Sequence, residues 1–326
     1  MSSEAPIGRQ LAVGIAWAVG FTAIIAATAG ALTTFDIVGP GAPFAYPWRL
    51  TVPDNMARVT AWVGYALHNL AAWGIIAAAQ RQKPGWSGGF RWFNWALVGV
   101  HSLFIVLHIV QTRIWYDGLA RDVPEITALA SVALMLMVVL VLENPRRGLA
   151  FGKKVSYPAG TVGAIKRYHG YLFSWALIYT FWYHPTEGTE GHLVGFLYMF
   201  MLFWQSALLY ARAHRNKWWT VSLELLVLPH GAIVAWHQGS GMWPMFPFGF
   251  GAMFVLTQMY GLGWSRGVTR GVTAAALVGT VAIYAALDRL ALLHEIVRIP
   301  VLDYGVVALI ALGFWIRNKA RQVAGA

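Results

Sequence analysis

Residues 223–245 read LELLVLPHGAIVAWHQGSGMWPM, an apolar stretch that carries two histidines seven residues apart, His230 and His237. A second apolar stretch repeats this spacing with His101 and His108. Seven residues make two helical turns, so each pair lies on one face of a helix, about 10 Å apart along its axis. A histidine inside a membrane is costly and indicates a functional site. The two stretches therefore predict membrane helices that carry an imidazole site.

The rest of the chain has the same apolar character. Of its 326 residues, 58% are hydrophobic and 11% are charged, and apolar runs of about 20 residues recur along the whole length. These features predict an all-α fold, a polytopic integral membrane helical bundle. We expect about ten transmembrane helices, at residues 11–33, 59–80, 93–116, 123–143, 166–184, 192–212, 218–237, 245–264, 268–288 and 299–317.

The charged residues indicate the orientation of these helices. Basic residues gather in alternate loops, at residues 81–91, 144–167, 212–217, 266–270 and 317–321, and the other loops are neutral or acidic. By the positive-inside rule both termini are cytoplasmic, and we expect an integral protein of the bacterial inner (cytoplasmic) membrane. The net charge of +11 is spread over short loops, so we expect membrane lipids as partners and no nucleic acid.

The loops are short, which predicts one membrane domain over residues 1–326. The matched histidine spacing suggests a parallel repeat of four helices, residues 11–143 and 166–264, followed by two C-terminal helices. The chain has no cysteine, which excludes thiolate metal sites, disulfides and iron–sulfur clusters.

The histidines fall at three depths when counted along the predicted helices. His68, His101 and His230 lie near the middle, and His169 and His214 lie on the inner side. The other five lie towards the outer side: His108, His184, His192, His237 and His294. Imidazole is a ligand for zinc, copper, iron and haem. Facing helices can therefore hold a haem between two axial histidines. One helix supplies His101 or His108, and the other supplies His230 or His237. Alternatively His68, His101 and His230, with His192 as a further ligand, can bind a transition metal (Fe, Cu or Zn).

Two further features surround these histidines. Residues 184–192 read HPTEGTEGH, in which His184, Glu187 and Glu190 are candidate catalytic residues that carry protons. Pro229 lacks a backbone N–H, and this predicts a kink in its helix beside His230.

These residues leave three functions open. The first is a membrane-bound oxidoreductase that holds haem or a metal in a histidine-lined cavity and acts on a lipophilic small molecule such as a quinone, isoprenoid or sterol. The second is a metal-free isomerase or hydratase that uses His and Glu as acid–base pairs. The third is a transporter, or a pigment- or cofactor-binding subunit that associates with a membrane-complex partner or as a homo-oligomer.

Overall fold

The computed structural model describes residues 5–39, 46–157, 159–237, 239 and 241–324. Within them the chain is helical and contains isolated bridges in place of strands. The α-helices are α1 (Ala5–Thr28), α2 (Asn55–Arg81), α3 (Trp92–Trp115), α4 (Glu125–Arg147), α5 (Ala159–Tyr183), α6 (Glu190–Ala207), α7 (Lys217–Leu225), α8 (Val227–His237), α9 (Met245–Leu256), α10 (Arg266–Ala286) and α11 (Arg298–Ala324). Short 3₁₀ helices are η1 (Ala29–Thr34), η2 (Leu119–Arg121), η3 (Arg212–Arg215), η4 (Gln258–Gly261) and η5 (Leu290–Val297).

The prediction of an all-α fold is confirmed, and each of the ten predicted segments contains helix. Five stretches of the described chain are long and apolar enough to cross a membrane, namely Ile7–Thr34, Trp92–Trp115, Glu125–Arg147, Lys217–His237 and Arg266–Ala286. These five indicate an integral membrane protein. Ten spans, the orientation of the helices and the kind of membrane stay predictions, as do the single domain and the four-helix repeat.

Several helix starts follow from capping side chains. Asp54 accepts the Met56 N–H at the start of α2, and Thr189 accepts the His192 N–H at the start of α6. Asn216 accepts two backbone N–H groups at the start of α7. Each cap supplies an acceptor to N–H groups that have no partner inside the helix.

The kink predicted at Pro229 is confirmed as a break between α7 and α8 at Leu226. The break lies three residues before the proline because the missing N–H of Pro229 would have bonded to the carbonyl of Leu225. The next bond along the helix, from the His230 N–H to the Leu226 carbonyl, is long at 3.5 Å.

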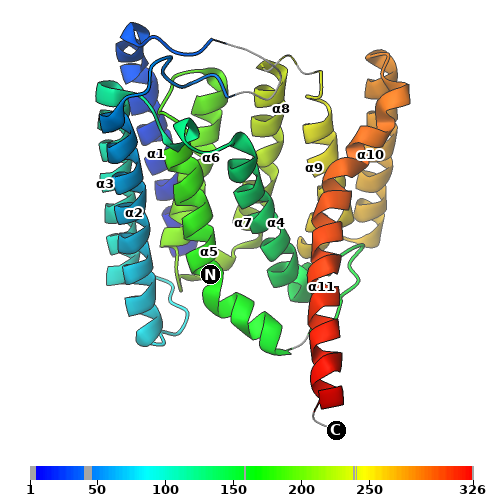
Figure 1. The fold of residues 1–326 in the computed structure, drawn as a ribbon. Coiled ribbons are helices and arrows are strands. Elements are labelled where there is room, and N and C mark those ends of the chain that lie inside the picture. Colours follow the sequence, from blue (N-terminus) through cyan, green and yellow to red (C-terminus); the bar gives the residue numbers. More distant parts are fainter. Residues whose placement is uncertain (1–4, 40–45, 158, 238, 240, 325–326) are drawn as a thin grey trace. The chain divides into compact units, whose positions relative to one another are not determined.

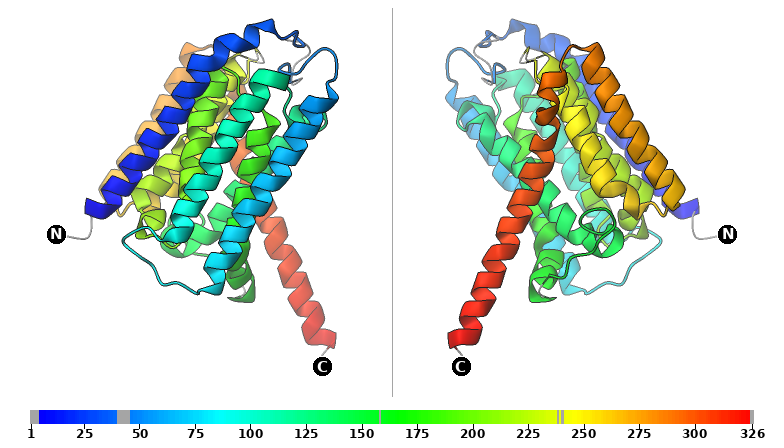
Figure 2. Two further views of the ribbon diagram at one scale, coloured as in Figure 1. Left: turned by 90° about the vertical axis from the view of Figure 1, so that its left-hand side faces the viewer. Right: turned by 90° about the vertical axis from the view of Figure 1, so that its right-hand side faces the viewer.

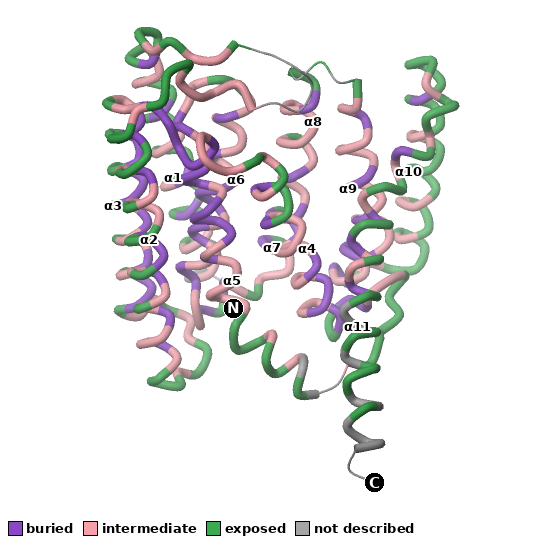
Figure 3. The backbone as a smooth tube through the Cα atoms, in the orientation of Figure 1, coloured by how far each residue is buried: buried purple, intermediate pink, exposed green. Residues whose placement is uncertain are grey.

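The chain divides into two compact units. Unit 1 comprises Met1–Val132 and Gly170–Ser240, and unit 2 comprises Ala133–His169 and Gly241–Ala326. In unit 1, α2 packs along α3, and α6 contacts α1, α3 and α8 (Figures 1 and 2). Buried and exposed positions alternate along α2 and α3 (Figure 3), as expected for helices with one packed face and one outward face.

The core of unit 1 is built from aromatic side chains of α5 and α6. The fully buried members include Phe181, Trp182, Phe200, Phe203 and Trp204. The core histidines of α2 and α3 pack against these rings. This arrangement places imidazoles in an aromatic interior, where each ring nitrogen needs a hydrogen-bond partner.

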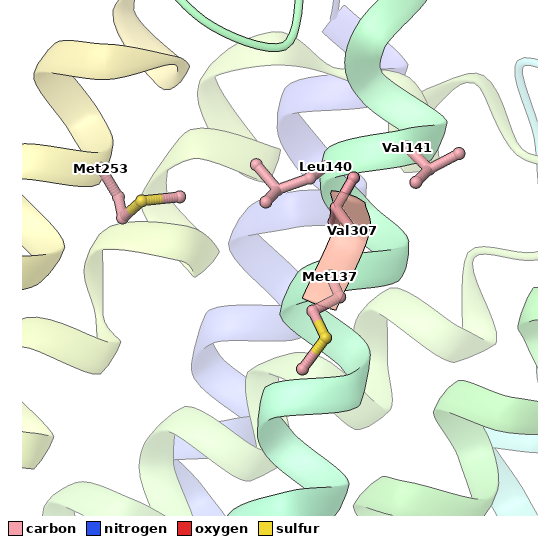
Figure 4. Close-up of a cluster of buried hydrophobic side chains, with 5 residues drawn as sticks. All are labelled: Met137, Leu140, Val141, Met253 and Val307. Carbon is pink, nitrogen blue, oxygen red and sulfur yellow. The ribbon is translucent and has the colours of Figure 1, made fainter. Parts of the chain in front are cut away.

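Unit 2 has an aliphatic core. Met137, Leu140 and Val141 of α4 form a buried cluster with Met253 of α9 and Val307 of α11 (Figure 4). One group of its polar interactions lies at the junction of α10 and η5. There the carboxylate of Glu295, on η5, accepts the Tyr284 hydroxyl at 2.7 Å and pairs with Arg289 at 3.2 Å.

Candidate functional site

The buried His68 and His101 form a direct pair between α2 and α3. The Nε2 atom of His68 lies 2.9 Å from Nδ1 of His101, and Trp182 Nε1 lies 3.3 Å from Nδ1 of His68. On the other side, Nε2 of His101 lies 2.9 Å from the Ser206 hydroxyl, which donates to the Phe203 carbonyl. Four helices of unit 1 therefore contribute to one hydrogen-bonded row, with Trp182 on α5 and Ser206 on α6.

The direction of every bond in this row follows from Trp182. An indole N–H can only donate, so His68 accepts at Nδ1 and carries its proton on Nε2. His68 then donates to Nδ1 of His101, and His101 donates from Nε2 to Ser206. Both imidazoles are neutral in this arrangement, and all four ring nitrogens have a partner. A metal ion at either residue would have to break the row.

His108, two turns further along the same face of α3, has a different set of partners. Its Nδ1 lies 3.0 Å from Gln111 Oε1, and its Nε2 lies 2.8 Å from the backbone carbonyl of His184. The Gln111 amide is oriented by its own bond from Nε2 to the Asp117 carbonyl, so Oε1 faces His108. Both partners are acceptors, which means that a neutral ring satisfies one of them and an imidazolium satisfies both.

A second group of aromatic and imidazole side chains lies where α5 ends and α6 begins. Tyr46 from the 35–54 loop places its hydroxyl 3.1 Å from Nε2 of His192, and Thr189 Oγ1 lies 2.7 Å from Nδ1 of the same ring. The rings of Tyr46 and His184 are 5.4 Å apart, and those of Trp48 and His192 are 4.7 Å apart. We call Tyr46, Trp48, His184, Thr189 and His192 the outer cluster.

His184 has one ring nitrogen that stays available in the outer cluster. Its Nδ1 lies 2.8 Å from the Thr180 carbonyl, so Nδ1 carries the proton and Nε2 has a lone pair. None of the described residues hydrogen-bonds to that Nε2. Such an arrangement suits a base or a metal ligand, because the backbone fixes both the tautomer and the ring orientation.

Tyr46 remains a neutral phenol beside it. Burial raises the pKa of the Tyr46 hydroxyl well above its ordinary value, and the neighbouring Tyr116, Tyr183 and Glu187 raise it further. Its loop is tied down at Leu50, whose N–H donates to Asp117 Oδ1 at 2.8 Å.

His230 lies on α8 against α6. A Cβ at Gly195 would lie 2.7 Å from Cε1 of His230, so the ring rests where α6 has no side chain. The Nδ1 atom of His230 is buried and has no hydrogen-bond partner among the described residues.

The predicted acidic residues have separate partners. Glu187 accepts the Tyr116 hydroxyl at 2.5 Å, and Glu190 pairs with Nε2 of His237 at 3.1 Å. The side chains of His237 and Glu190 are 51% and 80% exposed, so this pair contributes little to stability.

The structure thus brings some predicted site residues together and separates others. His68 lies with His101, His184 lies with His192, and Glu190 lies with His237, whereas His230 contacts Gly195 and Tyr198 of α6. Within the described part of the chain, no group of three His, Cys, Asp or Glu side chains is arranged to hold a metal ion. Metal or haem binding and the catalytic roles of His184, Glu187 and Glu190 stay predictions.

Sequence reasoning missed the partners that define these groups, namely Tyr46, Gln111, Trp182, Thr189 and Ser206. Thr189 has a local signal, because it caps α6 three residues before His192. The other four come from segments that are distant in sequence or from an ordinary helix face, and they have no such signal. No protein-family model, curated protein or solved structure matches the chain.

Proposed function

We propose that the protein is an integral membrane enzyme that moves a proton between two carbons of a lipophilic unsaturated carbonyl compound at the outer cluster. His184 acts as the base through Nε2, and the Tyr46 hydroxyl donates a hydrogen bond to the carbonyl oxygen of the substrate. The observation that carries this proposal is the unpartnered Nε2 of His184 beside the neutral phenol of Tyr46. The other ring nitrogen, Nδ1, fixes the imidazole by its bond to the Thr180 carbonyl at 2.8 Å.

The reaction is a double-bond isomerisation and needs no oxidant or reductant. His184 Nε2 takes a proton from the carbon next to the carbonyl, and the electron pair of that C–H bond becomes the new double bond of a dienolate. The negative charge develops on the oxygen that Tyr46 faces, where a positioned donor stabilises it. The protonated His184, whose N–H can exchange with solvent, then delivers a proton to the distal carbon, so atoms and charge balance and the enzyme is restored.

The contacts of His192 support the role of Tyr46. If Thr189 donates its hydroxyl proton to Nδ1 of His192, then Nε2 of His192 carries a proton and donates it to the Tyr46 oxygen. The hydroxyl proton of Tyr46 is then free for the substrate. Trp48 and Tyr183 add apolar surface around the hydroxyl, which suits a lipophilic substrate more than a charged one.

Deuterium incorporation tests the proposal without knowledge of the substrate. Membranes that contain the protein are incubated in D₂O with a total lipid extract of the host, and the lipids are analysed by mass spectrometry. Because the imidazolium N–H exchanges with solvent, we expect one lipid class to gain deuterium on carbon. His184→Gln should abolish the gain, and Tyr46→Phe should reduce its rate by about 10²–10³-fold, as expected for loss of an oxyanion donor.

His294→Asn is the matched control, because it removes an exposed imidazole from unit 2. The proposal fails if no lipid gains deuterium above the level of His184→Gln membranes. It also fails if the control variant loses incorporation to the same extent as His184→Gln.

A second candidate function keeps the cofactor expected from the sequence, haem or a transition metal (Fe, Cu or Zn) for redox chemistry on a quinone, isoprenoid or sterol. The observation that favours it is the buried Nδ1 of His230, which has no hydrogen-bond partner among the described residues. A visible spectrum and metal analysis of the purified protein test it, with loss of the signal expected in His230→Gln. Deuterium incorporation that survives chelation, in protein without a Soret band, would favour the isomerase instead.

A further inference from the structure

The loop between α2 and α3 is joined to η3 at one end of unit 1. The Ser87 N–H donates to the Tyr210 carbonyl at 3.0 Å, and the Arg212 N–H donates to the Ser87 carbonyl at 2.8 Å. These two bonds bring together segments that are more than a hundred residues apart in the chain. They also collect basic side chains from both segments on one surface, which we call the basic end of unit 1: Arg81, Lys83, Arg91, Arg212 and Arg215 (Figure 2 shows the α2–α3 loop).

Acidic side chains are scarce in the segments that meet at this surface. Residues 55–116 and 191–223, which cover α2, α3, η3 and all of α6 except its first residue, include neither Asp nor Glu, and Glu224 on α7 is buried. None of the five cations forms an ion pair with the described residues, and Arg81, Lys83, Arg212 and Arg215 are exposed. Five positive charges that have no ion-pair partner among the described residues attract an anionic ligand.

Exposed tryptophans surround the same charges. Trp86 is 44% exposed, and the guanidinium of Arg215 lies 5.1 Å from the centre of its ring. Trp92 at the start of α3 and Trp218 at the start of α7 are 50% and 53% exposed. Tryptophan is enriched at the depth of lipid headgroups, and α2 ends and α3 begins at this surface. The combination of cations and indoles at the ends of apolar helices fits a lipid headgroup better than a soluble anion.

We infer that the basic end of unit 1 binds the phosphate-containing headgroups of anionic phospholipids. The guanidinium groups of Arg212 and Arg215 contact the phosphate, and the indoles of Trp86 and Trp92 lie among the headgroups and upper acyl chains. This binding site is separate from the outer cluster, and it does not depend on the reaction proposed there.

Lipid retention and thermal stabilisation test the inference on the full-length protein. We expect protein purified in mild detergent to retain phosphatidylglycerol in preference to phosphatidylcholine, as measured by lipid mass spectrometry. After delipidation, added phosphatidylglycerol should raise the melting temperature and phosphatidylcholine should not. Each Lys or Arg near an anionic surface contributes about 1 kcal/mol, so the double variant R212Q/R215Q should weaken the binding by about 30-fold.

The control is K153Q/K154Q, which removes two exposed positive charges from a loop of unit 2 and should retain phosphatidylglycerol as the wild type does. If R212Q/R215Q does not fold, W86L and K83Q replace it, because neither side chain takes part in the backbone bonds between the loop and η3. Equal retention in the wild type and these variants would overturn the inference. It would also be overturned if inorganic phosphate at the same concentration stabilised the protein as much as phosphatidylglycerol, or if the control lost as much lipid.

Discussion

At the scale of single residues, the indole N–H of Trp182 determines the protonation pattern of the buried histidine pair. This donor faces Nδ1 of His68, so His68 must donate to His101. His101 then donates to the Ser206 hydroxyl, which donates to the Phe203 carbonyl. The row ends on a backbone acceptor, so it has no group that passes a proton onward. Its contribution is to hold α2, α3, α5 and α6 together with every imidazole nitrogen satisfied.

Removal of the last side chain tests this account. Ser206→Ala leaves the Nε2–H of the buried His101 without an acceptor, and we expect a loss of about 1–3 kcal/mol in the free energy of unfolding. The measurement is the thermal unfolding of purified protein in detergent. Ser222→Ala, at an exposed position of α7, should have little effect. Equal melting temperatures for the two variants would show that the row does not stabilise the fold.

Asp117 gives a prediction for the dependence of stability on pH. One of its carboxylate oxygens accepts the Leu50 N–H, and the other is buried without a partner among the described residues. Burial raises the pKa of Asp117 above its ordinary value of 3.8. The folded protein therefore binds this proton more tightly than the unfolded chain, and the stability contributed by Asp117 falls as the pH rises from 3.8 through its raised pKa.

Asp117→Asn keeps an acceptor for Leu50 and carries no charge. We expect its melting temperature to exceed that of the wild type by a margin that grows as the pH rises from 3.8 through the raised pKa of Asp117. Thermal unfolding of both proteins across this range is the measurement. A margin that is constant with pH, or one that shrinks as the pH rises, contradicts the prediction.

At the scale of elements, glycines on α6 set how closely α8 approaches. A Cβ at Gly195 would lie 2.7 Å from the His230 ring, whereas at Gly191, one turn earlier, the nearest atom would be Val234 Cγ2 at 3.5 Å. A contact at 3.5 Å is ordinary packing, and one at 2.7 Å forces the ring or the helix to move. The position of His230 on α8 therefore depends on the absence of a side chain at Gly195 of α6.

Gly195→Ala is expected to displace His230 and to destabilise the protein by about 1–3 kcal/mol, the usual range for overpacking. Gly191→Ala on the same helix is the matched control and should be close to neutral. Thermal unfolding gives the stability of each variant. The deuterium-incorporation assay reports whether the outer cluster is disturbed as well. If both variants unfold at the wild-type temperature, α8 does not pack on α6 in this way.

At the scale of the whole molecule, the five long apolar helices indicate a membrane protein, and the loop charges predict which loops share a side. The chain contains no cysteine, so single cysteines can be introduced and labelled without background. In intact cells we expect a membrane-impermeant maleimide to label E190C and L290C. K83C, K153C and R266C should react only after the membrane is opened.

All five positions are exposed, so poor access within the protein does not explain a missing label. Labelling of E190C and K83C from the same side would exclude an odd number of membrane crossings between them. Labelling of R266C and L290C from the same side would show that α10 does not span the membrane. Either result would reduce the predicted total of ten spans.

The sequence by itself was sufficient to predict the helical elements and most of their limits. Apolar runs separated by short polar loops predicted all ten helical segments, and Pro229 predicted the break between α7 and α8, because both depend on residues adjacent in the chain. His184 and His192, which bound the HPTEGTEGH stretch, were both placed towards the outer side, and their rings are 5.9 Å apart.

Only the tertiary structure decided which partner each imidazole has. His101 and His108 share one face of α3, yet His101 bonds to His68 and Ser206 while His108 bonds to Gln111 and the His184 carbonyl. Helical spacing determines the face on which a side chain lies. It does not determine how neighbouring helices are rotated and shifted against that face, which depends on the packing of large rings such as Trp182 and Phe203. The bonding of each histidine nitrogen therefore follows from contacts between helices that are distant in the chain.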